Sequence, residues 1–509
     1  MKIVFRTDAS AIIGHGHVMR CLTLADELRD HCSAVYFVCR PHEGHLCDTI
    51  KAKGYKVLRL PGPTAAAQNP DRHDHATWLG ASWPEDAAQT RDVIEGAGIK
   101  PEWLIVDHYA IDSSWEHVMR GRGTDVMVID DLADRRHDCD ILLDQNYYPS
   151  PSQRYAGLLP PYCMPFLGPE FVLLRKEFRI IKRAVRPREL NRLFLFFGGS
   201  DPTRQTETAV AAVTAFDPSL AMDVVVSNSN PRVDEIRRAC ATHPHARFFC
   251  QTDRMAELMA EASLALGAGG IATFERLYMG LPSVVVAVAS NQCEPLQSLA
   301  EAGHIEYLGG AAHVDKSAWI GALERQTGQG LRCPTLNVAT RTGSIVHSLL
   351  TKLVPFASRH IESTFVMLQD AGVRASFAMS RLPEWSSHVR YWEEKIADGA
   401  LVTFAIEHDG RHMGNCGIKP VPGREDCEGW IYLSIKAPRR AGMGETSFRR
   451  LLRIAFNDLD LPRLYLHVRR DNTPAVGMYR KIGFRPALKP VDTAVWGEET
   501  NVCKLVMEQ

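Results

Sequence analysis

Apolar residues form short continuous runs along the first 180 residues of the chain, and longer amphipathic segments separate these runs. Runs that are buried on both faces and joined by helical segments are typical of a parallel sheet covered by helices. Several runs end in an acidic residue, and ligands of such sheets bind beyond the carboxyl ends of the strands. We therefore predict an α/β lobe over residues 1–183, with strands near 2–6, 34–39, 56–60, 103–107, 126–131 and 141–144.

The same alternation begins again near residue 185 and continues to about residue 350. Its apolar runs predict a second α/β lobe of similar size over residues 184–352. Two such lobes facing each other form a cleft, which is the preferred place for a small-molecule site. The strands of this second lobe are expected near 192–197, 223–226, 247–250, 264–270 and 283–288.

The pattern changes after residues 351–362, which we interpret as a linker or domain edge. Beyond them, strand-like runs are joined by short polar turns, and His408-Asp409-Gly410 is a typical hairpin signal. These features predict a compact α+β module over residues 360–509, with strands near 401–406, 413–418 and 429–435.

Composition and charge narrow the class of protein. The 509 residues are 45% hydrophobic and carry a net charge of −1, which is ordinary for a globular protein and favours neither a nucleic-acid nor a membrane partner. No apolar run reaches the roughly 20 residues that span a bilayer, and no signal-peptide pattern is present, so we expect a cytoplasmic protein. The 13 cysteines are scattered without a C-x-x-C pair, so we expect reduced thiols and no metal site.

The first candidate site is the glycine-broken loop Gly14–Arg20, which joins the opening strand to an amphipathic segment. His17 stands where the helix should begin. Unpaired N–H groups and the positive end of the helix dipole suit an anion there, and a neutral histidine can act as a base. The alternative for His17 is a helix cap or a core histidine. The strand ends are expected to gather Asp8, Asp107, His108, Tyr109, Asp130 and Asp131 beside it.

The second candidate site lies in the second lobe. Gly269-Gly270 follows a strand and precedes a helix, so backbone amides are free to hold a diphosphate. Glu275, in the first turns of that helix, can bond a pair of ribose hydroxyls. Gly198-Gly199-Ser200-Asp201 forms a second loop of this kind. Each glycine pair alone is equally typical of a tight strand–helix turn, but both together favour a nucleotide site.

The order and spacing of these motifs resemble the UDP-sugar hydrolases of pseudaminic acid biosynthesis over about residues 1–350. The resemblance implies a two-lobed glycosyltransferase-B-like fold and a metal-independent, inverting hydrolysis of a UDP-sugar. It includes Cys139–Leu143 and Ser229-Asn230-Pro231. His15 departs from the family pattern and either perturbs His17 or faces solvent, while His108 is a second candidate base.

The resemblance also implies the roles of individual residues in this chain. His17 activates the water that attacks the anomeric carbon, and Asp107 and Tyr109 line the water side. Glu275 binds the ribose, and the amides of residues 269–273 lie near the diphosphate. The substrate-binding set is Gly16, Arg20, Gly198, Gly199, Ser200, Thr206, Asn230, Gly269, Gly270, Ile271, Thr273, Glu275, Asn291 and Gln292.

The C-terminal module carries its own glycine loop, Arg439-x-x-Gly442-x-Gly444, between a strand and a helix. Such a loop binds a pyrophosphate through backbone amides. With Asp471-Asn472 and the run Met478–Phe484 downstream, it resembles the GCN5-related N-acetyltransferases over residues 360–509.

This second resemblance implies acetyl-CoA as co-substrate. Tyr479 protonates the departing thiolate, with plain packing beside Phe484 as the alternative, and no residue is named as the amine-deprotonating base. The implied cofactor-binding set is Ile435, Arg439, Arg440, Gly442, Met443, Gly444 and Asn472.

We hypothesise two consecutive reactions on one chain. The first is N-acetylation of a UDP-4-amino sugar, and the second is hydrolysis of the resulting UDP-2,4-diacetamido-2,4,6-trideoxy-β-L-altropyranose to UDP and free sugar. The alternatives are a glycosyltransferase of the glycosyltransferase-B type with an acetyltransferase of other specificity, a hydrolase for an isomeric nonulosonate precursor, and a non-catalytic UDP-sugar sensor. The sequence leaves open the sugar stereochemistry, the acceptor amine, channelling between the sites, and whether the protein is a monomer or dimer.

Overall fold

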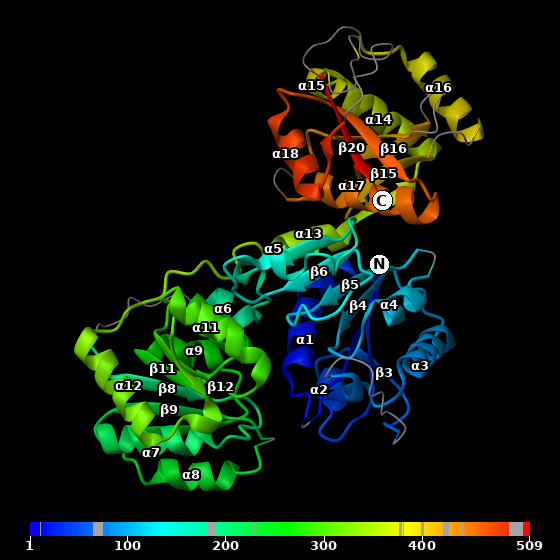
Figure 1. Cartoon of the computed structure of the whole chain (residues 1–509). Helices are drawn as coiled ribbons and strands as arrows, with labels where there is room; N and C mark the ends of the chain where they lie inside the picture. Colours follow the sequence, from blue (N-terminus) through cyan, green and yellow to red (C-terminus); the bar gives the residue numbers. More distant parts are fainter. Residues whose placement is uncertain are drawn as a thin grey trace. The chain divides into compact units, whose positions relative to one another are not determined.

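The computed structural model describes residues 1–10, 12–64, 75–121, 123–181, 189–228, 230–375, 379, 381–398, 402–420, 427–438, 441–487 and 502–508. The chain forms two compact units (Figure 1). The first unit comprises Met1–Leu158 and Pro165–Thr342, and the second comprises Leu159–Met164 and Gly343–Gln509. Within the described residues, no helix has the length and apolar character needed to cross a membrane.

The first unit opens with a seven-stranded sheet in the order β3-β2-β1-β4-β5-β6-β7. Its strands are β1 (Lys2–Thr7), β2 (Ala34–Cys39), β3 (Lys56–Arg59), β4 (Trp103–Asp107), β5 (Asp125–Ile129), β6 (Ile141–Asp144) and β7 (Met164–Leu167). The pairs from β3 through β6 are all parallel. The strand order reverses between β1 and β4, so the loops after these two strands part there and leave a crevice for a ligand.

Helices cover both faces of this sheet. They are α1 (Gly16–Leu28), α2 (Cys47–Ala52), α3 (Trp83–Gly96), α4 (Ser113–Met119) and α5 (Pro151–Arg154). In Figure 1, α1 and α2 lie on one side of the sheet and α3 and α4 on the other. This is the arrangement that right-handed crossovers produce when the strand order reverses.

A second parallel sheet in the same unit has the order β10-β9-β8-β11-β12-β13 and reverses between β8 and β11. Its strands are β8 (Arg192–Phe196), β9 (Ala221–Val226), β10 (Ala246–Cys250), β11 (Leu264–Ala268), β12 (Ser283–Ala287) and β13 (Glu306–Gly310). Its helices are α6 (Lys176–Ile180), α7 (Gln205–Phe216), α8 (Val233–Ala241), α9 (Met255–Glu261), α10 (Ile271–Tyr278), α11 (Cys293–Glu301) and α12 (Lys316–Gln329).

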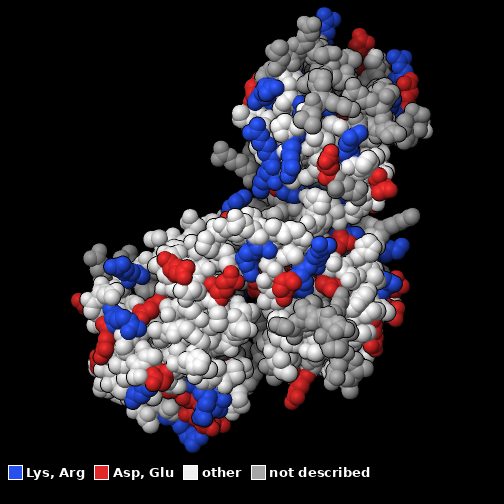
Figure 2. All heavy atoms as spheres, viewed as in Figure 1, with Lys and Arg blue, Asp and Glu red and all other residues white. Residues whose placement is uncertain are grey.

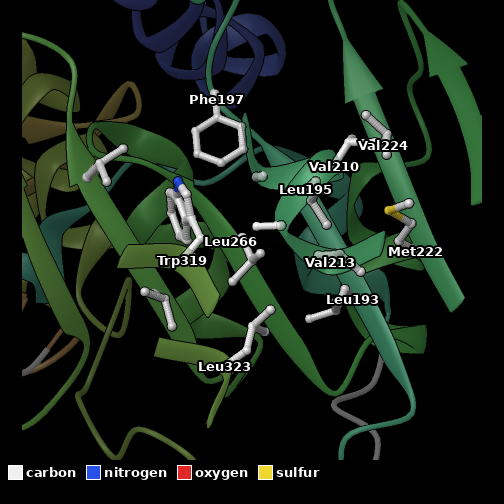
Figure 3. Packing of buried hydrophobic residues seen from close by; sticks show 14 of the residues in the cluster. Leu193, Leu195, Phe197, Val210, Val213, Met222, Val224, Leu266, Trp319 and Leu323 are labelled. Atoms are coloured by element: carbon white, nitrogen blue, oxygen red, sulfur yellow. The ribbon is translucent and has the colours of Figure 1, made fainter. Parts of the chain in front are cut away.

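The core of this second lobe packs α7, α8 and α12 against one face of the sheet. Figure 3 shows the side chains of Leu193, Leu195 and Leu266 from the strands between Val213 and Trp319 from the helices. The Phe197 and Trp319 rings meet edge to face with centroids 5.6 Å apart. This packing fixes the end of β8, from which the Gly198-Gly199 loop departs.

The second unit contains a sheet in the order β14-β15-β16-β17-β18-β20-β19. Its strands are β14 (Thr351–Pro355), β15 (Val402–His408), β16 (Arg411–Pro420), β17 (Cys427–Leu433), β18 (Arg463–Arg469), β19 (Arg485–Pro486) and β20 (Val502–Glu508). Its helices are α13 (Thr342–Leu350), α14 (Ile361–Leu368), α15 (Ala371–Ala375), α16 (Trp385–Asp398), α17 (Met443–Arg453) and α18 (Thr473–Ile482). The two α/β lobes and the following α+β domain that the sequence predicts are confirmed.

Two details of the second unit bear on the sequence predictions. The hairpin at 408–410 is confirmed, because Asp409 and Gly410 both have positive φ and join β15 to β16. Of the two interpretations of 351–362, a linker or a domain edge, the linker is wrong for Thr351–Pro355, which pair with β15 as the edge strand β14. Strands β17 and β18 pair in parallel only at Cys427–Leu464 and Glu428–Tyr465, so they diverge beyond Glu428.

Six residues from the middle of the chain, Leu159–Met164, belong to the second unit. Tyr162 is buried in the core formed with α17, and its hydroxyl accepts a hydrogen bond from Asn457 Nδ2 at 3.1 Å. Arg449 of α17 donates from Nη1 to the carbonyls of Pro161 and Cys163 at 3.0 and 2.8 Å. The ranges predicted from sequence, 1–183, 184–352 and 360–509, place this segment in the first lobe instead.

Candidate active site

The loop after β1 brings His17 to the first turn of α1. Gly14 has a φ of +80° and donates its N–H to the carbonyl of Ser10 at 2.9 Å, which closes a tight turn. The residue before the helix is His15, whose side chain makes no capping bond. His17 is therefore not the cap of α1, and its ring is 6% exposed. Burial lowers the pKa of His15.

Asp107, at the end of β4, holds His17 in place. Its Oδ1 lies 2.5 Å from His17 Nδ1, and its two oxygens accept from Arg20 Nη2 and Nε at 2.7 and 2.6 Å. Burial raises the pKa of Asp107, but Arg20 and His17 outweigh burial and lower it to about 2. Because an ionised carboxylate can only accept, Nδ1 of His17 carries the proton and Nε2 is left as the basic nitrogen.

Tyr109 forms the neighbouring part of the site. Its hydroxyl donates to Asp131 Oδ1 at 2.5 Å, and Asp131 Oδ2 also accepts from Arg20 Nη1 at 3.1 Å. Burial and the charge of Asp131 raise the pKa of Tyr109 well above its usual value, so the phenol stays protonated. Asn291 of the second lobe donates from Nδ2 to the same hydroxyl at 3.2 Å. This bond joins the two lobes directly.

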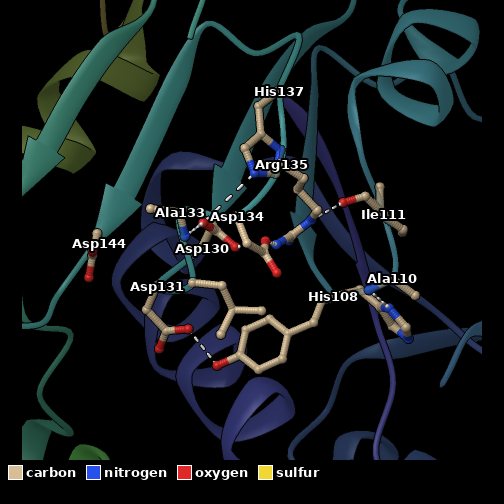
Figure 4. A network of polar contacts seen from close by, with 12 residues as sticks. His108, Ala110, Ile111, Asp130, Asp131, Ala133, Asp134, Arg135, His137 and Asp144 are labelled. Carbon is tan, nitrogen blue, oxygen red and sulfur yellow. Dashed lines mark hydrogen bonds and ion pairs between the residues drawn. The ribbon is translucent and has the colours of Figure 1, made fainter. Parts of the chain in front are cut away.

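A layer of buried ion pairs supports the ends of β5 and β6 (Figure 4). Arg135 lies 2.8 Å from Asp130 and donates to the carbonyl of Ile111 at 2.7 Å. Burial lowers the pKa of His137, but Glu116 and Asp130 raise it to about 9. Burial and the charge of Asp131 raise the pKa of Asp144 to about 7. The loops that carry Asp131 are thus fixed by charges that solvent does not screen.

His108, the second candidate base, is turned away from this site. Its Nε2 lies 3.3 Å from Asp8 Oδ2, and its Nδ1 accepts from the Ala110 N–H at 3.1 Å. Burial lowers its pKa. His108 is 3% exposed and does not line the cleft, whereas His17 does.

A cleft of about 410 Å³ lies between the two lobes of the first unit. Most of the residues predicted from sequence line it, and they come from both lobes. Five predicted residues do not line it, namely Asp107, Thr206, Asn230, Gly269 and Glu275. Those that do are Gly16, His17, Arg20, Tyr109, Gly198, Gly199, Ser200, Gly270, Ile271, Thr273, Asn291 and Gln292.

The glycine loop at the start of α10 leaves no room for side chains. Gly270 has a φ of +89° and stands at the N-cap of α10. A Cβ on Gly269 would lie 2.8 Å from Gln292 Oε1 and 2.9 Å from Leu296 Cδ1. Gln292 Oε1 also accepts from the Val288 N–H at 3.0 Å, so Gln292 supports the loop from behind. The N-terminus of α10 therefore faces the cleft with its amides exposed to a ligand.

Three predicted substrate-binding residues make other bonds. Thr206 donates from its hydroxyl to Asp201 Oδ2 at 2.6 Å near the start of α7. Asn230 is buried, and its Oδ1 accepts from the Arg232 N–H at 2.9 Å. Glu275 accepts from Arg175 Nε at 2.9 Å and is 3% exposed. The resemblance, rather than the structure, connects these three with the substrate.

Arg276, which the sequence analysis did not select, is fully buried directly beneath this loop. Its Nη2 donates to the Ala268 carbonyl at 2.8 Å and to Thr273 Oγ1 at 2.9 Å. No ion pair joins it to a carboxylate among the described residues, and burial lowers its pKa to about 10. A Cβ on Gly267 would lie only 2.5 Å from its Nη1. The sequence offers one signal for Arg276, which is its place in the second turn of a helix that follows the pair Gly269-Gly270.

The second unit builds a comparable loop at the start of α17. Gly442 has a φ of +82° and forms the N-cap, and Met443 and Gly444 are the first residues of the helix. Asn472 caps α18, where its side chain accepts from the Ala475 N–H at 3.4 Å. Ile435 follows β17 and is 56% exposed. Arg439 and Arg440, which are also predicted to bind the cofactor, lie outside the described residues.

Tyr479 lies on α18 within the aromatic core of the second unit. Its ring meets Phe448 and Phe484 edge to face at 5.0 and 5.8 Å, and burial raises its pKa. Figure 2 shows lysine and arginine side chains gathered around α18 on the viewed face of this unit. The last turn of α18 carries Arg480 and Lys481. In the described part of the chain, no group of three or more His, Cys, Asp or Glu side chains is arranged to hold a metal ion.

Comparisons with known proteins find different relatives for the N-terminal and C-terminal parts of the chain. Residues 351–485 match the family model of the acetyltransferase (GNAT) domain. The chain is similar to the UDP-2,4-diacetamido-2,4,6-trideoxy-beta-L-altropyranose hydrolase of Campylobacter jejuni. The two are 28% identical over 309 residues, which cover 60% of this chain and 99% of that protein. Among solved structures, MurG of Acinetobacter baumannii aligns with 64% of this chain and 90% of its own (13% identity, TM-score 0.43). The N-acetyltransferase PseH of C. jejuni, solved with acetyl coenzyme A, aligns with 31% of this chain and 99% of its own (18% identity, TM-score 0.24).

Proposed function

We propose that this chain, whose residues 351–485 are an acetyltransferase (GNAT) domain and whose N-terminal part resembles a UDP-sugar hydrolase, carries out two reactions on UDP-linked amino sugars. The first unit hydrolyses UDP-2,4-diacetamido-2,4,6-trideoxy-β-L-altropyranose to UDP and the free sugar. The second unit acetylates the 4-amino group of the preceding UDP-amino sugar with acetyl-CoA.

One observation carries the hydrolase proposal. His17 has its Nδ1 held 2.5 Å from the ionised Asp107, in a cleft whose opposite wall is the N-terminus of α10. A histidine fixed in this tautomer presents Nε2 as a base, and the helix amides suit a diphosphate. The resemblance to the C. jejuni hydrolase supports the choice of substrate, because it covers 99% of that protein.

In the proposed hydrolysis, His17 Nε2 takes a proton from water as the water oxygen attacks the anomeric carbon. The bond from that carbon to the diphosphate oxygen breaks, and its electron pair leaves with UDP. The amides of Gly270 and Ile271 and the dipole of α10 hold the developing charge on the diphosphate. Asp107 stabilises the imidazolium that forms. Attack from the side opposite UDP inverts the anomeric configuration.

In the proposed acetyl transfer, the amides of Gly442–Gly444 hold the pyrophosphate of acetyl-CoA. The amine attacks the thioester carbonyl, the carbon–sulfur bond breaks, and the departing thiolate takes the proton of Tyr479. The nitrogen loses one proton to water as the amide forms, and water returns a proton to the Tyr479 phenolate. Burial keeps the phenol of Tyr479 protonated at neutral pH, which is the form that can give a proton to the thiolate. The positive charge around α18 suits the phosphates of coenzyme A.

The test follows the full-length protein by NMR with the UDP-4-amino sugar and acetyl-CoA. We expect the N-acetylated UDP-sugar first, and then UDP with free sugar of inverted anomeric configuration. The His17→Ala variant should accumulate the acetylated UDP-sugar and lose UDP release by about 10²–10⁴-fold.

Three results would overturn parts of the proposal. UDP release at a near wild-type rate from the His17→Ala protein would show that His17 is not the base. UDP release only after an acceptor is added indicates a glycosyltransferase. Faster hydrolysis of an isomeric UDP-diacetamido sugar reassigns the substrate.

A further inference from the structure

Aromatic side chains form one continuous wall of the cleft in the first unit. Trp78 lies in the short 3-10 helix Ala76–Leu79, and His75 precedes that helix. The Trp78 and Tyr109 rings are stacked, with centroids 5.7 Å apart and planes at 29°. His75 meets Trp78 edge-on at 4.5 Å and Tyr109 at 5.2 Å. All three side chains line the cleft.

This wall ends at the base. The Tyr109 ring meets the His17 ring edge to face at 4.4 Å, so the aromatic surface continues without a break to His17. Tyr109 is fixed by the bond to Asp131, and Trp78 is only half-buried. Trp78 therefore keeps part of its apolar surface on the cleft.

Position along the cleft determines which part of a substrate meets this wall. The wall lies on the first lobe beside His17, whereas the diphosphate amides lie on the second lobe at Gly270 and Ile271. Because the water that His17 activates must reach the anomeric carbon, the sugar lies between the two, with the diphosphate toward the second lobe. The sugar, and not the uracil, is then the group that faces Trp78.

The chemistry of the wall distinguishes between sugars. A hydroxyl pressed against an indole ring loses its water without gaining a hydrogen bond, whereas a methyl group buries apolar area. In the proposed substrate, carbon 6 is a methyl group, and each acetamido group ends in a methyl group on its carbonyl carbon. A hexose with a free 6-hydroxyl brings a polar group to one of those positions.

We propose that Trp78, supported by His75 and Tyr109, is a specificity-determining residue that selects sugars bearing methyl groups over hydroxylated sugars. This inference rests on the proposed hydrolase function and names how its substrate is chosen. Trp78 contributes to sugar binding and does not take part in proton transfer.

The test measures binding by calorimetry in the full-length His17→Ala protein, so that the substrate stays intact. The ligands are the UDP-2,4-diacetamido-2,4,6-trideoxy sugar, UDP-N-acetylglucosamine and UDP. We expect Trp78→Ala to weaken binding of the diacetamido sugar by about 10–100-fold, which is the range for losing one or two methyl contacts. The dissociation constant of UDP should stay within about twofold, and that of UDP-N-acetylglucosamine should change far less than that of the diacetamido sugar.

Two further variants separate specificity from folding. Trp78→Phe keeps an aromatic face and should recover most of the lost affinity. Trp385→Ala removes a tryptophan that is 47% exposed in the second unit, and should leave all three constants unchanged. An equal loss for UDP and the diacetamido sugar overturns the inference, because it shows that Trp78 contacts the uridine or maintains the fold. No loss for the diacetamido sugar overturns it as well.

The same experiment keeps the two proposals apart. Continued UDP release from the His17→Ala protein counts against the hydrolase mechanism. The ratio of the dissociation constants for the diacetamido sugar and UDP, compared with and without Trp78, shows whether Trp78 selects the sugar.

Discussion

The two lobes of the first unit share one topology and place opposite chemistry at the same edge. Both sheets are parallel and reverse between their first and fourth strands. Charged and aromatic side chains stand at the reversal of the first lobe, where short hydrogen bonds join His17 to Asp107 and Tyr109 to Asp131. At the reversal of the second lobe stand glycine amides, and its cation, Arg276, is buried below them.

The difference matches the two tasks that we propose for these edges. Proton transfer requires one histidine tautomer in one orientation, and only neighbouring side chains can fix both. Holding a diphosphate requires several donors close to its oxygens, and backbone amides supply them without a side chain in the way. Substitutions at each edge test whether the two edges act independently.

The largest effect is expected from Asp107→Asn. An amide donates toward His17 Nδ1, so the proton moves to Nε2 and the base is lost. The rate constant for UDP release should fall by about 10³-fold or more, while the dissociation constant of UDP stays nearly unchanged. Stopped-flow and calorimetry measure the two quantities. Asp140→Asn removes another carboxylate of the same lobe, paired with Arg120 at 2.8 Å, and should retain the rate. A tenfold loss of UDP affinity in Asp107→Asn would show that the edges are coupled.

The reverse experiment is Gly269→Ala. Its new methyl group collides with Gln292 and Leu296, so the amide loop must shift. We expect UDP to bind about 10-fold more weakly, and the free energy of unfolding to fall by about 1–3 kcal/mol. Gly328→Ala is the control, because a Cβ there meets nothing within 4 Å. Unchanged UDP affinity in Gly269→Ala would remove this loop from the binding site.

A smaller effect is expected from Arg276→Met. Among the described residues no ion pair joins the buried guanidinium to a carboxylate, and Glu275 acts on its charge only from a distance, so we expect this charge to attract an anion at the loop above it. UDP should bind about 5–10-fold more weakly, whereas uridine, which has no phosphate, should bind equally well. The exposed Arg237→Met serves as the control. Equal losses for UDP and uridine would indicate that Arg276 only maintains the local fold.

The smallest functional effect concerns Asp144, whose pKa is raised to about 7 by burial and by Asp131. The folded protein keeps this proton where the unfolded chain has lost it, so the stability contribution is present below about pH 4 and is lost as the pH rises through 7. Asp144→Asn should therefore reduce the decline in the free energy of unfolding between pH 5 and 8 by about 1–3 kcal/mol. Denaturant titrations at both pH values measure this decline. The same decline in both proteins would contradict the raised pKa, and UDP affinity should not change.

Local sequence patterns predicted the loops of the sites. Gly14–Arg20, Gly269-Gly270 and Gly442–Gly444 each combine a strand end, a glycine and a helix start within a few residues. Backbone conformation at such places depends on the glycine itself, because Gly14, Gly270 and Gly442 all have positive φ. These features are therefore accessible from the sequence alone.

Features that depend on distant partners were not predicted. Glu275 accepts a hydrogen bond from Arg175, 100 positions earlier in the chain, and the residues around Glu275 do not predict that bond. Trp78 comes from a segment without apolar periodicity, so no pattern marked it as part of the cleft. The strand at Thr351–Pro355 exists because it pairs with β15, and its own sequence resembles a linker. Tertiary pairing decides all three cases.

The segment Leu159–Met164 has a consequence for how such a protein can be inherited and dissected. The acetyltransferase core is completed by Tyr162, which is encoded almost 200 codons before the rest of that unit. A gene fragment that begins at codon 343 therefore lacks part of its own product's interior. Recombination at a single junction cannot separate the two units completely, because Leu159–Met164 lies within the sequence range of the first unit. The two halves are consequently expected to be kept or lost together.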